Sequence, residues 1–538
     1  MAKVPVTIEG RNSIITSAFR IHVPQQTKKT TQNHNIYNYN SPLGLFPLFY
    51  DCSGKIIPIS ESVIDSTRVN YVNGDIIAPN DYGEGVMIKI PIPDNLKHLR
   101  NQSFSMAFGY FDCGWTVVNF QLDRADSMYF YCTTLTECYT NNYQYDKKVY
   151  KKPVRFVLYN AEVKTDAIFF DKEYLYVPKG IDDFYYLNKG SDEINVPVLH
   201  FNSDVKISNV DFCGIGGIVV DSKSENICDF NHCQFSNTLG CPLAIYKKHT
   251  ESLVPANIST CSFKNCAVYE NYVLSLKSDY GDNTFIRVMD CEITRYPDAV
   301  VFYKNSVPSV NVSGNVVLCH NVLYNNCRGH LALNRGKIIA KDNVIYNTDG
   351  FYRLWERNSS NDWGLIYCNH IFKDKDDAVS NTLHSILLED NLLYGAYAYG
   401  GDARGIFIDD GRGDVTCRGN IILNTQAYSI DARDSRFTDA SSVRVCYEKN
   451  LVTTIYRLQT GPAVEDVNQA MTRANVSWTK KNNEISKIKV LTEDICVERG
   501  DVSFTCSDSC INVSEDLYKA IRKTTAWKSI NKYVKKIR

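Results

Sequence analysis

Two adjacent carboxylates, Asp409 and Asp410, end a short apolar run in 403-ARGIFIDDGRGD-414. An apolar run of this length is typical of a buried strand. Two carboxyl groups held close together repel, so one keeps a proton near neutral pH while the other stays ionised, and such a pair can carry out acid–base chemistry. The alternative is turn chemistry, since Asp before Gly commonly caps the local backbone.

The acid pattern recurs 22 residues later, where Asp431 lies in the segment IDARD. If these segments are strands of successive coils, they lie about 4.8 Å apart. Setting GLIY over GIFI, and IDD over IDA, puts Asp409 and Asp431 in one column with Cys368, and places Asn369 and Asp410 beside it. A turn does not require this recurrence, which therefore favours a functional site.

Stacked carboxyl groups suit glycoside hydrolysis, in which one protonates the leaving oxygen and the other attacks the sugar or activates water. A separation of roughly 5–5.5 Å is typical of retaining enzymes, and roughly 6.5–9.5 Å of inverting ones. On this reasoning the candidate catalytic residues are Asp409, Asp410 and Asp431.

Basic, aromatic and two further polar residues near these acids are candidates for substrate binding. Arginine pairs with carboxylates through two hydrogen bonds, so nearby arginines could grip an acidic sugar or orient the acids. Aromatic rings in a loop over a strand face suit stacking on sugars, although packing of that loop explains them equally well. The candidates are Arg404, Arg412, Arg433, Trp355, Glu356, Trp363 and Asn369.

A repeated strand–corner–strand pattern must position these groups. Each repeat has an apolar stretch, then Asn or Cys, then a second apolar stretch, and the corners are spaced 22 to 48 residues apart. This spacing predicts coils of a right-handed parallel β-helix in which identical corners stack, with a long loop inserted in the 48-residue coil. A β-sandwich is the alternative, but it would not repeat one corner residue. The predicted corners are Cys233, Cys261, Cys291, Asn321, Asn343, Asn391, Asn420 and Asn450.

The remainder of the chain flanks this all-β solenoid. Residues 1–190 are predicted to form an irregular β-rich N-terminal lobe that leads into the β-helix at 191–480. Residues 481–538 form a C-terminal segment with a basic amphipathic helix, whose apolar residues are Leu517, Ile521, Ile530, Val534 and Ile537. We expect this helix to cap or pack across the end of the solenoid. A helix on a membrane surface is the alternative.

Composition excludes several functional classes. The 538 residues carry a net charge of −1, from 59 basic and 60 acidic residues, so no overall field attracts nucleic acid or an anionic membrane. We expect no membrane span, no metal and no cofactor, and the oligomeric state stays open. The chain has no signal peptide as it stands, which predicts a cytoplasmic protein, or a periplasmic or secreted one if a signal was removed. The 19 cysteines lack CxxC spacing and are expected to be mostly free, buried thiols.

Several stretches resemble known β-helix enzymes. The segments YNAEVKTDAIFFDKEYLYVPKG at 159, SDVKISNVDFCGIGGIVV at 203, NDWGLIYCN at 361 and GGDARGIFIDDGRGDVTCRGNIILN at 400 are similar to carbohydrate-active proteins around glycoside hydrolase family 141. The resemblance covers residues 106–450. It implies exo-acting fucosidase or xylanase activity on plant polysaccharide without a metal, and an irregular β lobe that leads into the helix.

The resemblance also implies which acids act. The conserved acids of family 141 fall here on Asp362 and on Asp409 or Asp410. A more distant resemblance to the β-xylosidases of family 120 implies Asp409 with Asp431 instead. The leading hypothesis is therefore an exo-acting glycoside hydrolase for a plant- or microbe-derived polysaccharide or oligosaccharide. The alternatives are a polysaccharide lyase on a uronic-acid glycan and a non-catalytic glycan-binding β-helix.

Overall fold

The structure is a computed structural model. It describes residues 6–16, 18–22, 27–30, 33–38, 47–64, 87–92, 94, 96–97, 106–110, 117–134, 156–160, 166–170, 174–181, 183–187, 199–223, 226–248, 254–267, 272–278, 285–295, 308–326, 329–334, 336–348, 363–369, 385–396, 403–409, 414–425, 429–434, 444–452, 457–460, 477–481, 484–485, 502–505 and 510–536.

The chain divides into two compact units. The first contains residues 1–17, 195–299 and 307–538, and the second contains residues 18–194 and 300–306. The predicted boundary near residue 190 lies close to the start of the long segment of the first unit. The structure differs at the N-terminus, because β1 (Val6–Ile15) pairs in parallel with β17 (Val205–Cys213) and so belongs to the same unit as the later strands.

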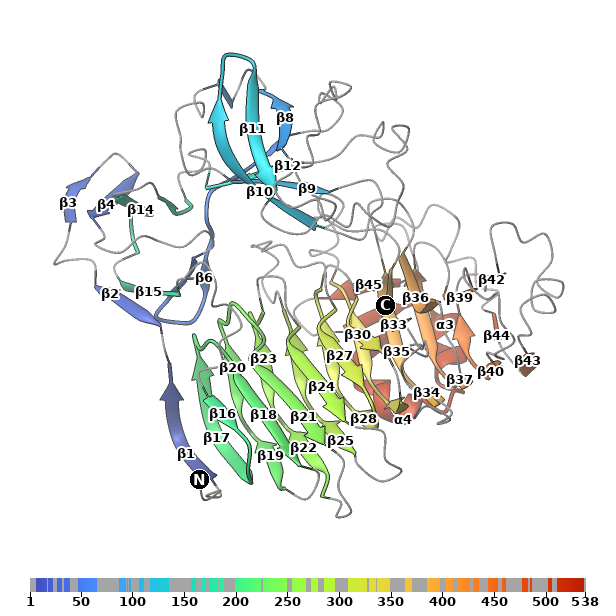
Figure 1. Cartoon of the computed structure of the whole chain (residues 1–538). Coiled ribbons are helices and arrows are strands. Elements are labelled where there is room, and N and C mark those ends of the chain that lie inside the picture. The colour runs from blue at the N-terminus through green and yellow to red at the C-terminus, as the bar shows by residue number, and fades with distance from the viewer. Residues whose placement is uncertain are drawn as a thin grey trace. The chain divides into compact units, whose positions relative to one another are not determined.

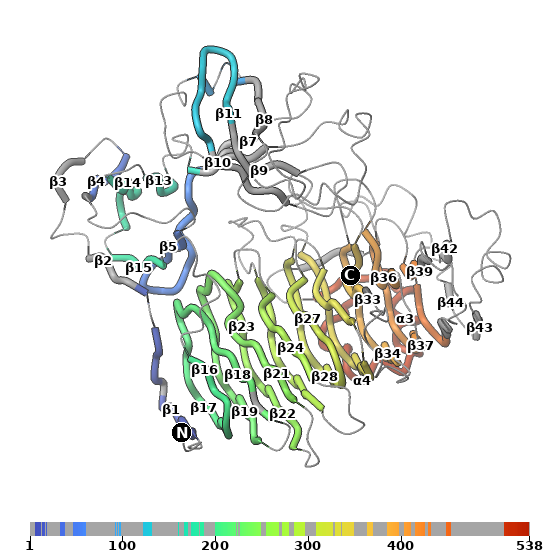
Figure 2. The backbone as a smooth tube through the Cα atoms, viewed as in Figure 1, coloured from blue at the N-terminus to red at the C-terminus, as the bar shows by residue number. Residues whose placement is uncertain are grey.

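The first unit is a parallel β-helix, which confirms the predicted fold. Its described strands form two long parallel sheets, of twenty and ten strands, along which the chain advances coil by coil. Figure 1 shows the successive coils side by side, and Figure 2 traces the same path from β16 and β17 to β36 and β39.

After β1 and β17, the strands of the twenty-stranded sheet are β19 (Cys228–Asn231), β20 (Gln234–Ser236), β22 (Ala256–Ser259), β23 (Ser262–Lys264), β25 (Ile286–Met289), β26 (Glu292–Thr294), β28 (Val316–Cys319), β29 (Val322–Tyr324), β31 (Lys337–Lys341), β32 (Val344–Tyr346), β34 (Ser385–Glu389), β35 (Leu392–Ala396), β37 (Asp414–Arg418), β38 (Ile421–Thr425), β40 (Arg444–Glu448), β41 (Leu451–Val452), β43 (Ser477–Lys481) and β44 (Glu484–Ile485). The ten-stranded sheet contains β16 (Leu199–Phe201), β18 (Ile218–Lys223), β21 (Leu243–Lys248), β24 (Leu274–Ser278), β27 (Val310–Ser313), β30 (Leu331–Leu333), β33 (Trp363–Asn369), β36 (Ala403–Asp409), β39 (Ile430–Asp434) and β42 (Arg457–Thr460).

The second unit is β-rich, as predicted for the lobe. A six-stranded sheet contains β7 (Glu61–Ile64), β12 (Phe156–Tyr159), β9 (Met106–Tyr110), β10 (Val117–Ala125), β11 (Tyr129–Thr134) and β8 (Met87–Pro91). Two four-stranded sheets contain β13 (Phe169–Phe170), β14 (Tyr174–Pro178), β4 (His34–Asn38) and β3 (Thr27–Thr30), and β2 (Phe19–His22), β15 (Asp183–Leu187), β5 (Leu48–Asp51) and β6 (Ile56–Ile57).

The predicted corner ladder is confirmed. The Nδ2 of Asn343 donates to Asn391 Oδ1 at 3.0 Å, and the Nδ2 of Asn391 donates to Asn420 Oδ1 at 2.9 Å. Each of these amides also donates to a main-chain carbonyl of the coil before it, and each side-chain oxygen accepts the main-chain N–H of the corner before it. The same pattern extends from Asn321 to Asn450, so the corners are fully hydrogen bonded while buried.

The first three corners use cysteine instead. The thiols of Cys233, Cys261 and Cys291 are buried and donate to main-chain carbonyls. The twelve cysteines whose side chains the structure describes are free thiols, and most of them are buried, as the sequence predicts. Burial raises the pKa of Cys228 and of Cys368 to about 12, so these thiols stay protonated and pack as small apolar groups.

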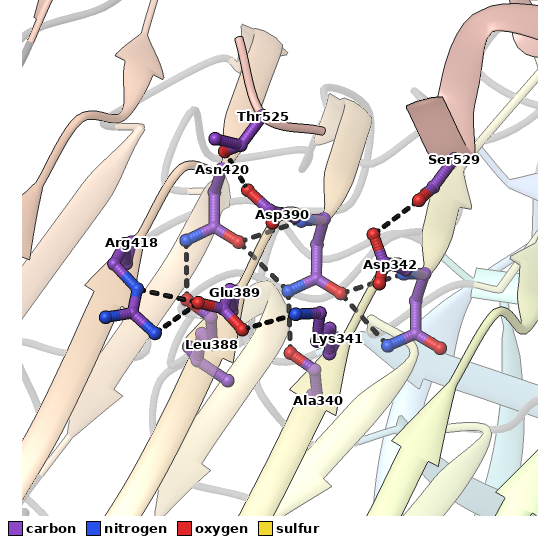
Figure 3. A network of polar contacts seen from close by, with 12 residues as sticks. Ala340, Lys341, Asp342, Leu388, Glu389, Asp390, Arg418, Asn420, Thr525 and Ser529 are labelled. Atoms are coloured by element: carbon purple, nitrogen blue, oxygen red, sulfur yellow. Dashed lines mark hydrogen bonds and ion pairs between the residues drawn. The ribbon is translucent and has the colours of Figure 1, made fainter. Parts of the chain in front are cut away.

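A column of alternating charge runs beside the ladder. Lys341, Glu389, Arg418, Glu448 and Lys481 occupy one register position on successive strands. Glu389 Oε2 lies 2.8 Å from Lys341 Nζ, and Arg418 Nε donates to Glu389 Oε1 at 2.6 Å (Figure 3). Opposite charges on neighbouring strands stabilise this register, and a one-residue slip would separate the paired charges.

The C-terminal segment covers a lateral face of the β-helix. It comprises β45 (Val502–Thr505), β46 (Cys510–Val513), α3 (Glu515–Ile521), α4 (Trp527–Ile530), the 3₁₀ helix η7 (Asn531–Tyr533) and β47 (Val534–Lys536). The predicted apolar face is confirmed for four residues, since Leu517, Ile521, Ile530 and Val534 are buried, and Ile537 lies outside the described residues.

The predicted position across the end of the solenoid is wrong, because these residues pack on the strand faces of β32, β35, β38 and β41.

The residues of those strands explain why the C-terminal segment packs there. The strands β20 and β23 alternate exposed and buried residues, whereas β32, β35 and β38 are buried throughout. An apolar outward face in the later coils requires a cover, which the C-terminal segment provides.

Two hydroxyls tether this segment to the corners. Ser529 Oγ donates to Asp342 Oδ1 at 2.5 Å, and Thr525 Oγ1 donates to Asp390 (Figure 3). The next corner has Gly419 at φ +65°, where a Cβ would lie 2.2 Å from Asp390 and 2.8 Å from Thr525 Oγ1. A side chain at residue 419 would therefore displace the tether.

Asn391→Ala should lower the free energy of unfolding by about 2–4 kcal/mol, because it leaves buried amide and carbonyl groups of neighbouring corners unpaired. The measurement is urea unfolding followed by near-ultraviolet circular dichroism. Asn334→Ala is the matched control, since the partly buried Asn334 amide donates to Asn311 and to the Val312 carbonyl of the adjacent coil, and its loss should cost about 1 kcal/mol or less. Equal costs for the two variants would contradict a structural role of the ladder.

Glu389 should make stability depend on pH. Burial raises the pKa of Glu389, but hydrogen bonds from Lys341 and Arg418 outweigh burial, so its pKa lies below the ordinary value. Its stabilising contribution is therefore complete above the unfolded-state pKa, about 4.3, and is lost as the pH falls through the lower folded-state pKa. Wild type should exceed Glu389→Gln in stability at pH 7, and the difference should shrink as the pH falls below about 4. A difference that stays constant from pH 7 to pH 3 would exclude this linkage.

Candidate active site

The candidate acids lie on β36 and β39 of the ten-stranded sheet. The register pairs Asn369 with Asp409 and Asp409 with Arg433, whereas Asp431 pairs with Phe407. The predicted column of Cys368, Asp409 and Asp431 is therefore wrong. Cys368 pairs with Ile408, one position from Asp409, and Asp431 lies two positions from it.

For Cys368 and Asp409 the error originates at the glycines, whereas Asp431 is displaced from Asp409 by a two-residue difference in the register of β36 and β39. The alignment of GLIY over GIFI pairs Gly364 with Gly405, but the structure pairs Gly364 with Arg404. A one-residue shift moves every side chain to the opposite face of a strand. Identical letters therefore gave the wrong register, and the structure pairs Asn369 with Asp409, whereas the alignment had placed it beside the column together with Asp410.

Asp409 is partly exposed at the end of β36. The hydroxyl of Tyr367, on the adjacent strand β33, donates to Asp409 Oδ2 at 2.8 Å. Tyr367 is itself 9% exposed. Residues 367 and 369 lie on one face of β33, and 407 and 409 on the matching face of β36, because side chains alternate along a strand. The carboxylate is thus held at the edge of a largely buried aromatic surface.

Arg404 and Asp431 form a fully buried ion pair. Arg404 Nε donates to Asp431 Oδ2 at 2.5 Å, and both side chains have 0% exposure. The guanidinium carbon of Arg404 lies 4.1 Å from the centre of the Phe407 ring. A buried charge pair of this kind is tolerated because each charge compensates the other and the planar guanidinium stacks on the ring.

Gly405 explains how Arg404 reaches this face. A Cβ on Gly405 would lie 2.3 Å from Ile422 Cγ2 and 2.6 Å from the Ser429 carbonyl oxygen. The position of residue 405 thus faces β38, on the opposite sheet of the coil, and cannot hold a side chain. Arg404 is directed the other way, toward Phe407 and Asp431.

Phe407 connects the two polar pairs. The Tyr367 and Phe407 rings lie 5.3 Å apart between centroids, tilted by 32°. Asp431, Arg404, Phe407, Tyr367 and Asp409 therefore form one continuous series of contacts across three strands. Sequence reasoning missed Tyr367 and Phe407, although the correct register would have placed both beside the acids.

The remaining candidates divide into three groups. Trp363 is fully buried, as expected if it packs in the core instead of offering a face to a sugar. For Asn369 and Arg433 the structure describes the backbone register, not the side chains. Outside the described residues lie Asp362, Asp410, Trp355, Glu356 and Arg412.

Within the described residues, no group of three or more His, Cys, Asp or Glu side chains could hold a metal ion. In the same part of the chain, no helix has the length and apolar character needed to cross a membrane.

Comparison with known proteins gives structural similarity only. No family model and no curated protein matches the chain. A solved glycoside hydrolase is similar at 10% identity and a TM-score of 0.49, over 90% of this chain and 88% of that one. The catalytic unit of a GH87 α-1,3-glucanase from Streptomyces thermodiastaticus is similar at 9% identity and a TM-score of 0.26, over 80% of this chain and 97% of that one.

A periplasmic alginate epimerase is similar at 12% identity and a TM-score of 0.23, over 53% of this chain and 70% of that one. At these values the similarities assign neither a family nor a reaction, and membership of family 141 stays a prediction.

Removing one partner of the buried ion pair should be costly. Arg404→Met or Asp431→Asn should each lower the free energy of unfolding by about 3–5 kcal/mol, because each leaves one buried charge uncompensated. The double variant should cost clearly less than the sum of the two. Additive losses in urea unfolding would show that the two side chains do not interact.

Proposed function

We propose that the protein is a glycoside hydrolase in which Asp409 acts as an ionised carboxylate. The observation that carries the proposal is the hydrogen bond from the Tyr367 hydroxyl to Asp409 Oδ2, at the partly exposed end of a buried strand. A donor to a carboxylate oxygen favours the charged form. Asp409 therefore suits the role of nucleophile or general base rather than that of the acid.

The acid is then a different carboxyl group. Asp431 serves as the counter-ion of Arg404 in a pair with no exposure, so it has no direct path to a substrate. We assign the proton-donor role to Asp410 or Asp362, the other two acids indicated by the sequence. Because a glycosidase needs both roles, the distance between the two carboxyl groups decides between retention and inversion.

The substrate in this proposal is a plant- or microbe-derived polysaccharide or oligosaccharide, attacked from its end, with fucosides and xylosides as the first compounds to test. Arg412, Arg433 and Asn369 are proposed to contact its polar groups. Trp355 and Glu356 of the long insertion are proposed to contact the sugar ring.

Asp409→Asn should abolish hydrolysis. The assay uses aryl α- and β-glycosides of fucose, xylose, arabinose, galactose and uronic acids, with the first anomer released read by NMR. We expect a loss of at least about 10²-fold in kcat/KM, because the amide cannot act as base or nucleophile. Asp221→Asn, on β18 of the same sheet, is the matched control and should retain activity.

If Asp409→Asn is as active as wild type, the hydrolase proposal is wrong and the two acids serve only to stabilise a turn. Binding of a glycan by wild type without cleavage would instead support a glycan-binding β-helix.

Tyr367→Phe should leave a folded enzyme with a shifted pH profile. Loss of the hydroxyl donor removes a hydrogen bond to the charged form, so the pKa of Asp409 should rise. The acidic limb of kcat/KM, which reports the free enzyme, should move to higher pH. An unchanged limb with reduced kcat would show that Tyr367 acts on the substrate and not on Asp409.

A further inference from the structure

We infer that Arg404 and Asp431 are positioning residues for Asp409. They set its orientation through the packed rings of Phe407 and Tyr367, and they set its charge environment directly. The inference rests on the proposed role of Asp409. It assigns a function to a buried ion pair that itself lies out of reach of a substrate.

The mechanical part follows from the contacts. The Arg404 guanidinium lies over the Phe407 ring, and Asp431 fixes the guanidinium from the neighbouring strand. Phe407 in turn packs against the ring of Tyr367, whose hydroxyl holds Asp409. Arg404 and Phe407 are fully buried, so neither can move without opening the packed face.

The electrostatic part follows from the charges. Asp431 lies opposite Phe407, two residues from Asp409 along the strand direction, which corresponds to a backbone separation of about 8 Å. While the pair is intact, the opposite charges of Arg404 and Asp431 largely cancel at Asp409. Removing one of them exposes Asp409 to the other, and the sign of the effect depends on which is removed.

The described strands next to Asp409 carry a phenol and three charged side chains. Tyr367 is on β33, Arg404 on β36 itself, and Asp431 on β39, while Arg433 occupies the register position directly opposite Asp409. Arg433 stays unchanged in every variant below, so its contribution is constant.

The test measures the protonation of Asp409 without relying on turnover. A water-soluble carbodiimide with an amine nucleophile modifies carboxyl groups in their protonated form, and peptide mass spectrometry reads the extent at Asp409 against pH. Arg404→Met should raise the midpoint pH by about one unit, and Asp431→Asn should lower it by a similar amount. Arg418→Met, which breaks the Glu389 pair on the other sheet, is the matched control and should leave the midpoint unchanged.

Phe407→Leu tests the mechanical part without changing any charge, and it keeps the inference testable if a charge variant fails to fold. It should raise the midpoint, as Tyr367→Phe does, and it should add nothing in the Tyr367→Phe background. Shifts of the same sign for Arg404→Met and Asp431→Asn, or an undiminished Phe407→Leu effect without the Tyr367 hydroxyl, would overturn the inference.

The proposed function can fail separately. If no glycoside is cleaved while the midpoints shift as expected, the hydrolase proposal is wrong and the tuning of Asp409 stands. If cleavage depends on Asp409 but the midpoints do not shift, the enzyme proposal stands and the positioning role is wrong.

Discussion

The stacked corner side chains are the interaction on which the rest of the β-helix depends. A corner that turns the chain outside regular strand geometry leaves main-chain groups unpaired inside the protein. At the five later corners an asparagine pairs these groups with the neighbouring coils, and at the first three corners a buried cysteine thiol donates to a main-chain carbonyl. The residue before each of the eight corners is left-handed, as at Asp342 with φ 56° and Asp390 with φ 54°, which brings the side chain of the next residue inward. This repeated geometry fixes the register of one coil against the next.

Once the register is fixed, the outer surfaces of the β-helix differ in polarity. Beside the corners, alternating charges on Lys341, Glu389 and Arg418 stabilise neighbouring strands at the partly exposed surface. On the later coils the outward face is apolar and is covered by the C-terminal segment. On the ten-stranded sheet, the register brings Asp431 beside Phe407 and places Tyr367 within hydrogen-bonding distance of Asp409. The twenty-stranded sheet therefore carries contacts that stabilise the β-helix, and the ten-stranded sheet carries the hydrogen-bonded carboxylate of Asp409.

Asp409 at the end of β36 and Asp431 one coil later have different surroundings, although the sequences around them look alike. Asp409 is partly exposed and accepts a neutral hydroxyl donor, whereas Asp431 is fully buried against a guanidinium. A buried charge pair is a costly way to fill space and often stabilises no better than apolar residues of the same size. Its place next to the aromatic rings that hold Asp409 is the reason to connect it with function.

The sequence alone determined the fold class, the eight corner residues and the apolar residues of the C-terminal segment, because each depends on a local pattern repeated along the chain. The structure shows that the apolar triplets of β32, β35 and β38 are buried on both faces, which the repeat pattern of the sequence did not predict. Only the tertiary structure decided that the cover is lateral, that Asp431 pairs with Arg404, and that Tyr367 reaches Asp409. The contact of Tyr367 with Asp409 depends on a one-residue difference in register between β33 and β36, and the position of Asp431 on a two-residue difference between β36 and β39. In both cases side-chain packing across coils, and not the similarity of the letters, sets which residues meet.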